Sequence, residues 1–194
     1  MSQNAPIIDV FWMGPFAWPG YEDVASLPPI PMHPGVYLQT FEYEDGFLIY
    51  GAGLTRRNIP TRLKEHTRKY LSGDYTVLDL VAIRNGKRKE IWHGWGWTPE
   101  KKQAFESRKS EILKGVRNQL AGFRIFVTDI GTAPRILERL EAAIMNNLYE
   151  QPTPYCDIPD RGMQLAARWD SESILIARVT CSETLHGLPK DLQM

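Results

Sequence analysis

The sequence predicts a mixed α/β (α+β) fold in which helices flank a small antiparallel β-sheet. Three observations lead to this fold class. Stretches rich in β-branched and aromatic residues come in pairs joined by short turn sequences, as in β-hairpins. Longer stretches with the apolar periodicity of amphipathic helices alternate with these pairs. The composition, with 43% apolar and 24% charged residues, is that of an ordinary globular protein.

The N-terminal segment, residues 1–34, is rich in proline, glycine and aromatic residues. Prolines at this density exclude a long helix, because proline lacks the backbone N–H that a helix interior requires. The aromatic side chains, among them Trp12 and Trp18, indicate an arm that packs on the body of the protein. We therefore expect the more regular structure to begin near Gly35.

A first β-hairpin is predicted directly after this arm. Residues 36–43 and 47–52 are β-prone, and they flank the sequence Glu44-Asp45-Gly46. Asp-Gly between two such stretches is a strong hairpin signal. The two strands are therefore expected to pair in antiparallel fashion.

A helix over residues 59–71 is predicted next. Thr55 or Asn58 is available as its N-cap, and Pro60 suits its first turn because that turn needs no N–H donor from it. Ser72-Gly73 is expected to end the helix, since glycine readily adopts the left-handed conformation found there.

A second hairpin and a long helix are predicted in the middle of the chain. Residues 75–83 read as a strand, and Asn85-Gly86 turns the chain toward a partner strand over residues 88–92. Thr98-Pro99 then opens a long basic helix that extends to about residue 120.

The last third of the chain begins with a short strand over residues 123–129. An amphipathic helix over residues 133–149 follows, with an apolar stripe that includes Leu137 and Ile144. The remainder is less regular, with a strand predicted at 174–179 and a final turn at 187–189.

Cysteine content and hydropathy predict a cytoplasmic protein with no membrane partner. The chain has only two cysteines, Cys156 and Cys181, whereas a disulfide-stapled secreted scaffold of this kind normally carries more. No apolar run reaches the roughly 18 residues of a membrane-spanning helix. The N-terminus also lacks the basic region that precedes the apolar part of a secretory signal.

Charge is distributed unevenly along the chain, although the formal net charge is zero. Residues 1–50 contain six acidic residues and no lysine or arginine, whereas residues 51–120 contain sixteen basic and seven acidic residues. Screening limits electrostatic interactions to about 8 Å at physiological salt, so the local charge decides where a phosphate binds. The chain can therefore present a basic face to nucleic acid, and a solvated charged surface is the alternative.

The predicted helix 59–71 carries a pair of side chains suited to phosphodiester chemistry. Arg62 and His66 are four residues apart and so project from one face, which Lys69 continues. A guanidinium offers fork-shaped donors to phosphate oxygens, and an imidazole can accept or release a proton near neutral pH. On its own the pair is weak evidence, because the same spacing occurs often on solvated helix surfaces.

The order of the neighbouring motifs resembles that of the GIY-YIG nuclease family. Gly35-Val36-Tyr37 is followed by a strand that ends in Ile49-Tyr50-Gly51-Ala52-Gly53, and then by Arg62 and His66. In that family, a Gly-Ile-Tyr strand and a Tyr-Ile-Gly strand precede a helix with an essential arginine. A later helix carries a metal-binding glutamate, and Glu141 is similar to that residue. The resemblance spans residues 35–150, and residues 35–70 are its specific part.

The second motif departs from the family pattern. If Gly53 is the family's glycine, the tyrosine position falls on Gly51; if Gly51 is that glycine, it falls on Ile49. Tyr50 lies between the two positions, and neighbouring residues of a strand face opposite sides. Tyr50 can replace the family's tyrosine only if a local bulge turns it inward, which Gly51 and Gly53 permit.

The resemblance implies a metal-dependent endonuclease that hydrolyses phosphodiester bonds of DNA, with Mg²⁺ (or Mn²⁺) as cofactor. Glu141 would hold the metal, and Arg62 would stabilise the phosphorane-like transition state. His66, with Tyr37 or Tyr50, would orient or deprotonate the water. A single glutamate suffices, because Mg²⁺ is often bound by one or two carboxylates together with waters and phosphate oxygens. Restriction-type double-strand cleavage is one form of this activity, and it would require a homodimer.

The resemblance also implies a domain organisation: a nuclease-like domain at residues 35–150, with an insertion at about 74–120, and a C-terminal extension at 151–194 that packs on it. We expect DNA contacts from basic residues in the first helix region and in the insertion: Arg56, Arg57, Lys69, Lys87, Arg88, Lys101 and Lys102. The tryptophans of the insertion, Trp92, Trp95 and Trp97, are expected in the core, and stacking on bases is the alternative.

Two other functional classes remain open. A catalytically impaired DNA-binding module would keep the GIY-YIG-like fold and the basic face but lack the second tyrosine. A protein-interaction domain would use Tyr37 and Tyr50 only as packing residues, which is the usual role of tyrosine on a strand.

Overall fold

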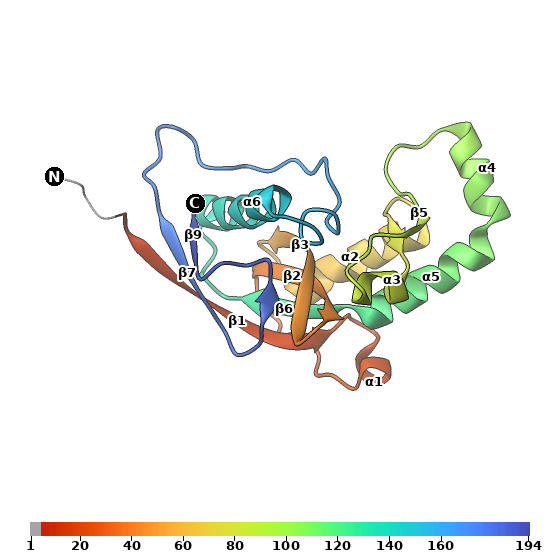
Figure 1. Ribbon diagram of the computed structural model, residues 1–194, viewed down its shortest axis with the longest axis horizontal. Coiled ribbons are helices and arrows are strands. Elements are labelled where there is room, and N and C mark those ends of the chain that lie inside the picture. Colours follow the sequence, from red (N-terminus) through yellow and green to blue (C-terminus); the bar gives the residue numbers. More distant parts are fainter. Residues whose placement is uncertain (1–4) are drawn as a thin grey trace.

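The computed structural model describes residues 5–194, which form one curled seven-stranded sheet with helices on both faces (Figure 1). The strand order is β8-β3-β2-β6-β1-β7-β9, and a separate two-stranded sheet is made by β4 and β5. The strands are β1 (Ile7–Ala17), β2 (Gly35–Tyr43), β3 (Gly46–Thr55), β4 (Val77–Leu78), β5 (Glu90–Trp92), β6 (Arg124–Thr128), β7 (Ile176–Cys181), β8 (Leu185–His186) and β9 (Asp191–Gln193). The helices are α1 (Glu22–Ala25), α2 (Ile59–Leu71), α3 (Leu80–Arg84), α4 (Pro99–Ser107), α5 (Lys109–Gly122) and α6 (Pro134–Glu150).

The mixed α/β class is confirmed, but the prediction of a small antiparallel sheet is wrong. The sheet is larger because strands from both ends of the chain extend it: β1 pairs with β6 in antiparallel and with β7 in parallel fashion. β8 likewise adds to β3 in parallel. Part of the N-terminal segment 1–34 is therefore a strand of the main sheet. Pairings between segments so distant in the sequence leave no local pattern to read.

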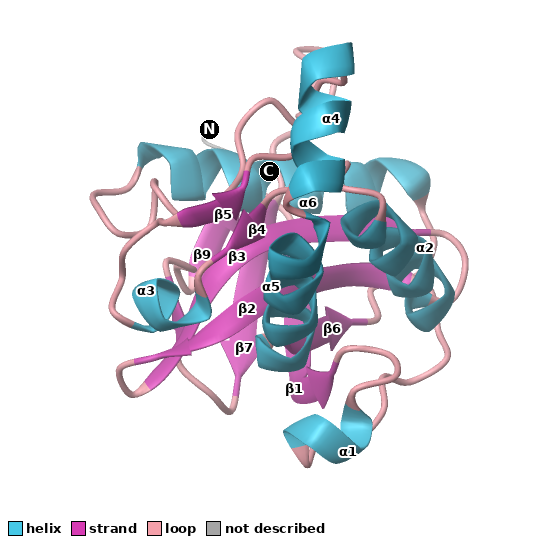
Figure 2. Cartoon of the chain, turned by 90° about the vertical axis from the view of Figure 1, so that its right-hand side faces the viewer, coloured by secondary structure: helices cyan, strands magenta, loops and turns pink. Residues whose placement is uncertain are grey.

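Two apolar cores lie on opposite faces of the sheet. In Figure 2, α2 and α5 lie in front of the sheet and α6 runs behind it. The first core contains Leu63 of α2 and Val116 of α5, together with the aromatic residues Phe41 and Phe123. The second core is formed by the apolar stripe of α6, which packs on the other face of the sheet. The amphipathic pattern predicted for residues 133–149 is thus confirmed.

The first hairpin and the helix after it follow the sequence prediction. β2 pairs with β3 in antiparallel register from Gly35 opposite Thr55 to Tyr43 opposite Gly46. α2 has the predicted bounds, with Asn58 at the N-cap position and a proline in the first turn. Local signals suffice for these elements because the turn, the cap and the apolar stripe all lie within a few residues of one another.

The predicted strand over residues 75–83 is wrong in its second half. Only Val77 and Leu78 form a paired strand, and α3 begins at Leu80. Asp79 is the reason, because its carboxylate accepts hydrogen bonds from the backbone N–H groups of Val81 and Ala82, at 3.0 and 3.2 Å. This is the geometry of a helix N-cap. β4 and β5 still pair in antiparallel fashion, as the second hairpin requires.

The predicted helix over residues 98–120 is two helices, α4 and α5. Thr98 caps α4 as expected, since its hydroxyl accepts the Lys101 N–H. The helical path breaks at Arg108, which has a φ of −108°. α4 projects away from the body of the protein in Figure 1, whereas α5 packs on the sheet. In the part of the chain that the structure describes, no helix combines the length and the apolar character needed to span a bilayer.

Candidate active site

A pocket of about 500 Å³ lies beside the second half of β3, and all five predicted catalytic residues line it. Tyr37 comes from β2, Tyr50 from β3, Arg62 and His66 from α2, and Glu141 from α6. Other polar and aromatic side chains complete the wall: Gln39, Tyr70, Tyr75, Trp95, Asp160 and Gln164.

Arg62 and Glu141 reach this pocket from helices on opposite faces of the sheet. Among the described residues, β8 pairs only with Phe47 and Leu48 of β3, so the stretch from Gly51 to Leu54 is a sheet edge. Around this edge the Arg62 guanidinium comes close enough to the Glu141 carboxylate for its positive charge to lower the pKa of Glu141. The edge therefore lets one hollow take side chains from both layers.

A β-bulge directs Tyr50 into the pocket. Gln39 pairs with Gly51 and the next residue of β2, Thr40, pairs with Ile49, so Tyr50 has no partner in the register. Tyr50 consequently packs on the same face as Tyr37, whereas Ile49 packs on the other face. The bulge that the sequence analysis requires at this position is present.

Gly53 makes room for the Tyr37 ring. The two residues are directly paired between β2 and β3, and a Cβ at position 53 would lie 2.4 Å from the Tyr37 hydroxyl oxygen. Any side chain here would displace the ring, because that separation is far inside van der Waals contact. A glycine is thus a steric requirement of the site.

Tyr37 and His66 are in direct contact. The Tyr37 hydroxyl oxygen lies 3.3 Å from His66 Nε2, and the two rings meet edge to face. Burial, and to a smaller extent the neighbouring Arg62 charge, lower the pKa of His66 to about 4, and Glu65 offsets only part of this effect. His66 is therefore neutral at physiological pH and has one ring nitrogen free to accept a hydrogen bond.

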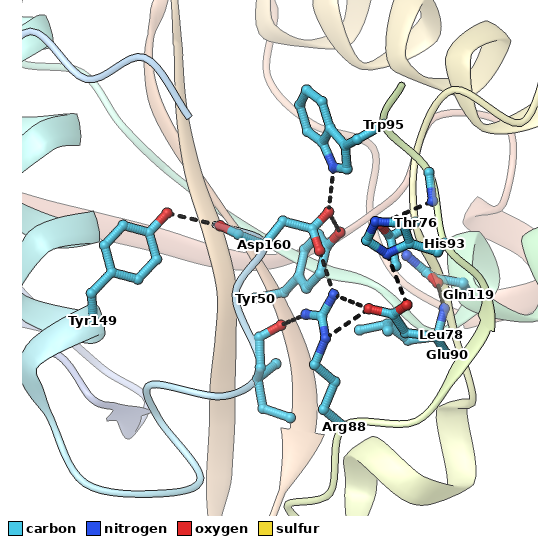
Figure 3. Close-up of polar contacts among 12 residues, drawn as sticks. Tyr50, Thr76, Leu78, Arg88, Glu90, His93, Trp95, Gln119, Tyr149 and Asp160 are labelled. Carbon is cyan, nitrogen blue, oxygen red and sulfur yellow. Dashed lines mark hydrogen bonds and ion pairs between the residues drawn. The ribbon is translucent and has the colours of Figure 1, made fainter. Parts of the chain in front are cut away.

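Asp160 holds the hydroxyl of Tyr50 (Figure 3). Its carboxylate accepts hydrogen bonds from the Tyr50 hydroxyl at 2.9 Å, from Arg88 Nη2 at 2.6 Å and from Trp95 Nε1 at 3.1 Å. These contacts join β3, the segment 88–95 and the C-terminal segment at one wall of the pocket. Sequence reasoning misses Asp160, because it lies in the irregular part of the chain and no local motif marks it.

Both tyrosines are neutral in this environment. Burial raises the pKa of Tyr37 and of Tyr50 above the ordinary value. The Arg62 charge beside Tyr37 offsets only part of this effect, since desolvation is the largest cause. The charge of Arg62 therefore does not lower the pKa of Tyr37 enough to ionise its hydroxyl.

Glu141 has the character expected of a cation ligand. Burial raises its pKa to about 7, and the Leu54 backbone N–H and the Arg62 charge compensate only in part. A half-buried carboxylate that is incompletely compensated gains from a nearby cation. Among residues 5–194, the only cluster of three potential metal-binding side chains is Glu44, Asp45 and His186, outside this pocket. One carboxylate with room for waters and phosphate oxygens fits Mg²⁺ or Mn²⁺.

The predicted DNA-contacting residues fall into two groups. Arg88 and Lys101 are used by the fold: Arg88 contacts Asp160 and the Ile158 carbonyl, and Lys101 Nζ donates to the carbonyls of Gly94 and Trp95. The other five residues, Arg56, Arg57, Lys69, Lys87 and Lys102, are exposed. Three of them form surface ion pairs: Arg56 with Glu138, Arg57 with Glu65, and Lys69 with Asp74. Exposed ion pairs are weak, so these side chains can exchange a carboxylate for a phosphate.

The three tryptophans between residues 92 and 97 also differ in burial. Trp92 is buried in the first core, as predicted, and its Nε1 donates to the Gly73 carbonyl. Trp95 and Trp97 are exposed by 48% and 45%, so the expectation of core packing is wrong for both. Only Trp95 belongs to the lining of the pocket.

No protein-family model, curated protein or solved structure matches this chain. Function is therefore inferred from the side chains of the pocket and from their chemistry. An always-charged guanidinium, a neutral imidazole, two neutral phenols and a carboxylate with a raised pKa meet in one hollow. This set suits the transfer of a charged, oxygen-rich group such as a phosphoryl group.

Proposed function

We propose that the protein is a metal-dependent endonuclease that hydrolyses phosphodiester bonds of DNA, in the manner of the GIY-YIG family that its motifs resemble. The observation that carries this proposal is the convergence of Tyr37, Arg62, His66 and Glu141 on one pocket, with Tyr50 turned in by the bulge. Such a convergence from β2, β3, α2 and α6 is not required by packing alone.

Arg62 would receive the phosphate. Its side chain is 40% exposed, contacts Glu65 at 3.3 Å and lies beside the Tyr37 hydroxyl, and its remaining N–H donors would bind phosphate oxygens. As the oxygen of water bonds to phosphorus and the P–O bond to the leaving sugar oxygen breaks, negative charge grows on the equatorial oxygens, and the sugar oxygen leaves as a hydroxyl after it takes up a proton. A guanidinium fixed beside them stabilises that charge more in the transition state than in the ground state.

His66 would accept the proton of the attacking water. Its low pKa in the free protein results from burial and from Arg62, and the negative charge of a bound phosphate would offset the effect of Arg62. A phosphate beside His66 would therefore favour proton transfer to the imidazole. Tyr37 would hold the imidazole in place by accepting a hydrogen bond from His66 Nε2–H, which would leave Nδ1 as the nitrogen that accepts the proton.

Glu141 would hold the divalent ion. When bound, a divalent ion supplies a Lewis acid that polarises the phosphoryl group and lowers the pKa of water. The raised pKa of Glu141 means that protons compete with the ion below about pH 7.

Plasmid cleavage with Mg²⁺ or Mn²⁺ tests the proposal. Arg62→Ala and Glu141→Gln should each lower cutting by at least a hundredfold, the size expected when one charge-stabilising group is lost. Glu141→Gln should keep its affinity for DNA. Arg68→Ala on α2 and Glu150→Gln on α6 are matched controls, because both residues are exposed and lie outside the pocket. Persistent cutting by Glu141→Gln would remove Glu141 from the mechanism.

The alternative is a DNA-binding module that has lost catalysis, and one contact favours it. The Tyr50 hydroxyl is already engaged by Asp160, which limits its access to a substrate. Specific DNA binding without cutting under any divalent ion would select this alternative. An absence of DNA binding even at low salt would instead favour a protein-interaction domain. A homodimer, which double-strand cleavage would require, stays a prediction.

A further inference from the structure

Trp95 stands at the rim of the pocket and is fixed at its inner end. Its Nε1 donates to Asp160 at 3.1 Å (Figure 3). Its ring packs against Tyr75 with centroids 5.7 Å apart. Its carbonyl accepts a hydrogen bond from the ammonium group of Lys101. Nearly half of Trp95 is nevertheless exposed. The fold therefore holds an indole in one orientation without covering it.

The backbone around Trp95 is arranged to present this side chain. Trp95 has a φ of +58°, in the left-handed region that bulky residues rarely adopt. Gly94 before it lies against the chain at Tyr75, where an added Cβ would come within 2.3 Å of the Tyr75 carbonyl carbon. The Trp95 N–H donates to the Asp74 carbonyl at 3.0 Å. Backbone strain of this kind persists only where surrounding contacts enforce it, and it concentrates at functional sites.

A series of aromatic rings leads from the reaction centre to Trp95. The His66 and Tyr75 centroids are 5.3 Å apart, and those of Tyr75 and Trp95 are 5.7 Å apart. A phosphate held by Arg62 beside His66 would therefore place an adjoining nucleotide near the exposed indole. Aromatic side chains beside a phosphate site are the usual platform for unstacked bases.

We infer that Trp95 is a stacking platform for a nucleobase next to the cleaved phosphate, and that the substrate is DNA in which this base is unpaired. The inference rests on the proposed nuclease function and extends it to a substrate class. In a continuous duplex both faces of each base are covered by its neighbours, so an indole can stack only on a base that has left the helix or lies in a single strand. Single-stranded and branched DNA offer such bases without the cost of unstacking.

Trp97 provides a matched control. It is as exposed as Trp95, and it comes from the same loop. Its Nε1 donates to Asp74 and its ring meets the edge of Phe105, away from the pocket lining. If DNA binding depended only on exposed aromatic area, Trp95→Leu and Trp97→Leu would weaken binding equally. If Trp95 stacks on a base, only Trp95→Leu weakens binding.

The test measures binding by fluorescence anisotropy in the Glu141→Gln background, so that the DNA stays intact. Labelled single-stranded, branched and fully paired oligonucleotides are compared. Trp95→Leu should bind the single-stranded and branched DNA about tenfold or more weakly, as expected for one lost base stack. Trp95→Phe should recover part of the loss, and Trp97→Leu should bind like its parent.

An abasic substitution distinguishes stacking from a structural role. After the cut is mapped with the wild-type protein, the base on each side of it is removed in turn. At the stacked position, removal should weaken binding to the parent and leave binding to Trp95→Leu unchanged, since both changes delete the same contact. If Trp95→Leu does not fold, Trp95→Phe decides, because the abasic site should weaken its binding less than it weakens binding to the parent.

Two failures are distinguishable. If the wild-type protein cuts DNA but Trp95→Leu and Trp97→Leu bind every DNA with equal affinity, the stacking inference alone is overturned. The stacking inference is also overturned if the parent binds fully paired DNA most tightly and Trp95→Leu keeps that preference. A wild-type protein that neither binds nor cuts DNA would overturn the proposed function itself.

Discussion

Glu141 shows at the scale of a single residue how a buried carboxyl reduces stability. Its carboxyl reaches a pKa of about 7, mainly through burial, and the two compensating groups do not restore the ordinary value of 4.5. A negative charge that the fold leaves partly uncompensated is held in place by the packing of α6. Strained or poorly solvated groups are common where a protein prepares a site for a charged ligand.

Glu141→Gln should therefore stabilise the metal-free protein at alkaline pH. Because folding raises the pKa of this acid, the folded state prefers the protonated form. The penalty is absent below pH 4.5, grows as pH rises and is complete above about pH 7. At pH 8 it amounts to up to about 3 kcal/mol.

Thermal unfolding in EDTA at pH 8 and pH 4.5 checks this expectation. The melting temperature of Glu141→Gln should exceed that of the wild type at pH 8, and the gain should nearly vanish at pH 4.5. Glu150→Gln, at an exposed position of the same helix, should show no such pH dependence. An unchanged melting temperature for Glu141→Gln at both pH values would contradict the raised pKa.

At the scale of the element, the β2–β3 hairpin positions the two tyrosines through its glycines. The bulge at Tyr50 brings both phenols to one face, and Gly53 leaves the space that the Tyr37 ring occupies. The hairpin is thus a scaffold whose side-chain directions depend on one unpaired residue and one missing Cβ.

Gly53→Ala tests whether the site needs the space beside the Tyr37 ring or only the backbone flexibility of a glycine. The added methyl group would displace the Tyr37 ring from His66, which should destabilise the protein by about 1–3 kcal/mol and reduce DNA cutting. Gly51→Ala is the matched control, because nothing lies within 4 Å of a Cβ built there. Urea denaturation and plasmid cleavage measure the two effects, and equal results for both variants would refute the steric explanation.

At the scale of the whole molecule, Asp160 joins parts of the chain that are far apart in the sequence. It receives hydrogen bonds from β3, from the segment after α3 and from the loop after β5. Further along, Arg135 of α6 holds the same C-terminal segment through Glu172 and the carbonyls of Ala166 and Ala167. The loop that runs along α6 in Figure 1 is therefore attached at both ends.

Asp160→Ala should loosen the C-terminal segment near the pocket. Arg88 would lose one of its two carboxylate partners, and the expected loss of stability is about 1.5–3 kcal/mol, the range for hydrogen bonds to charged groups. Limited trypsin digestion should cleave faster after Arg161, an exposed site next to Asp160. Asp157→Ala, a nearby exposed acid, should leave the digestion rate as it is in the wild type.

The sequence by itself determined the elements whose signals lie within a few residues. The first hairpin, α2 with Arg62 and His66 on one face, and the apolar stripe of α6 follow from turn chemistry and periodicity. Local signals also misled at two places, where Asp79 caps a helix inside a β-prone run and where the chain breaks at Arg108. In both, one side-chain or backbone detail outweighs the propensity of its neighbours.

Only the tertiary structure decided which distant side chains meet. Three features join residues that are separated by many tens of positions in the sequence. They are the parallel pairing of β1 with β7, the approach of Glu141 to Arg62 around the edge of β3, and the contacts of Asp160. Periodicity states which face of an element is apolar, but it does not state against which element that face packs. Those encounters depend on how the whole chain closes its two cores, which is a property of the complete fold.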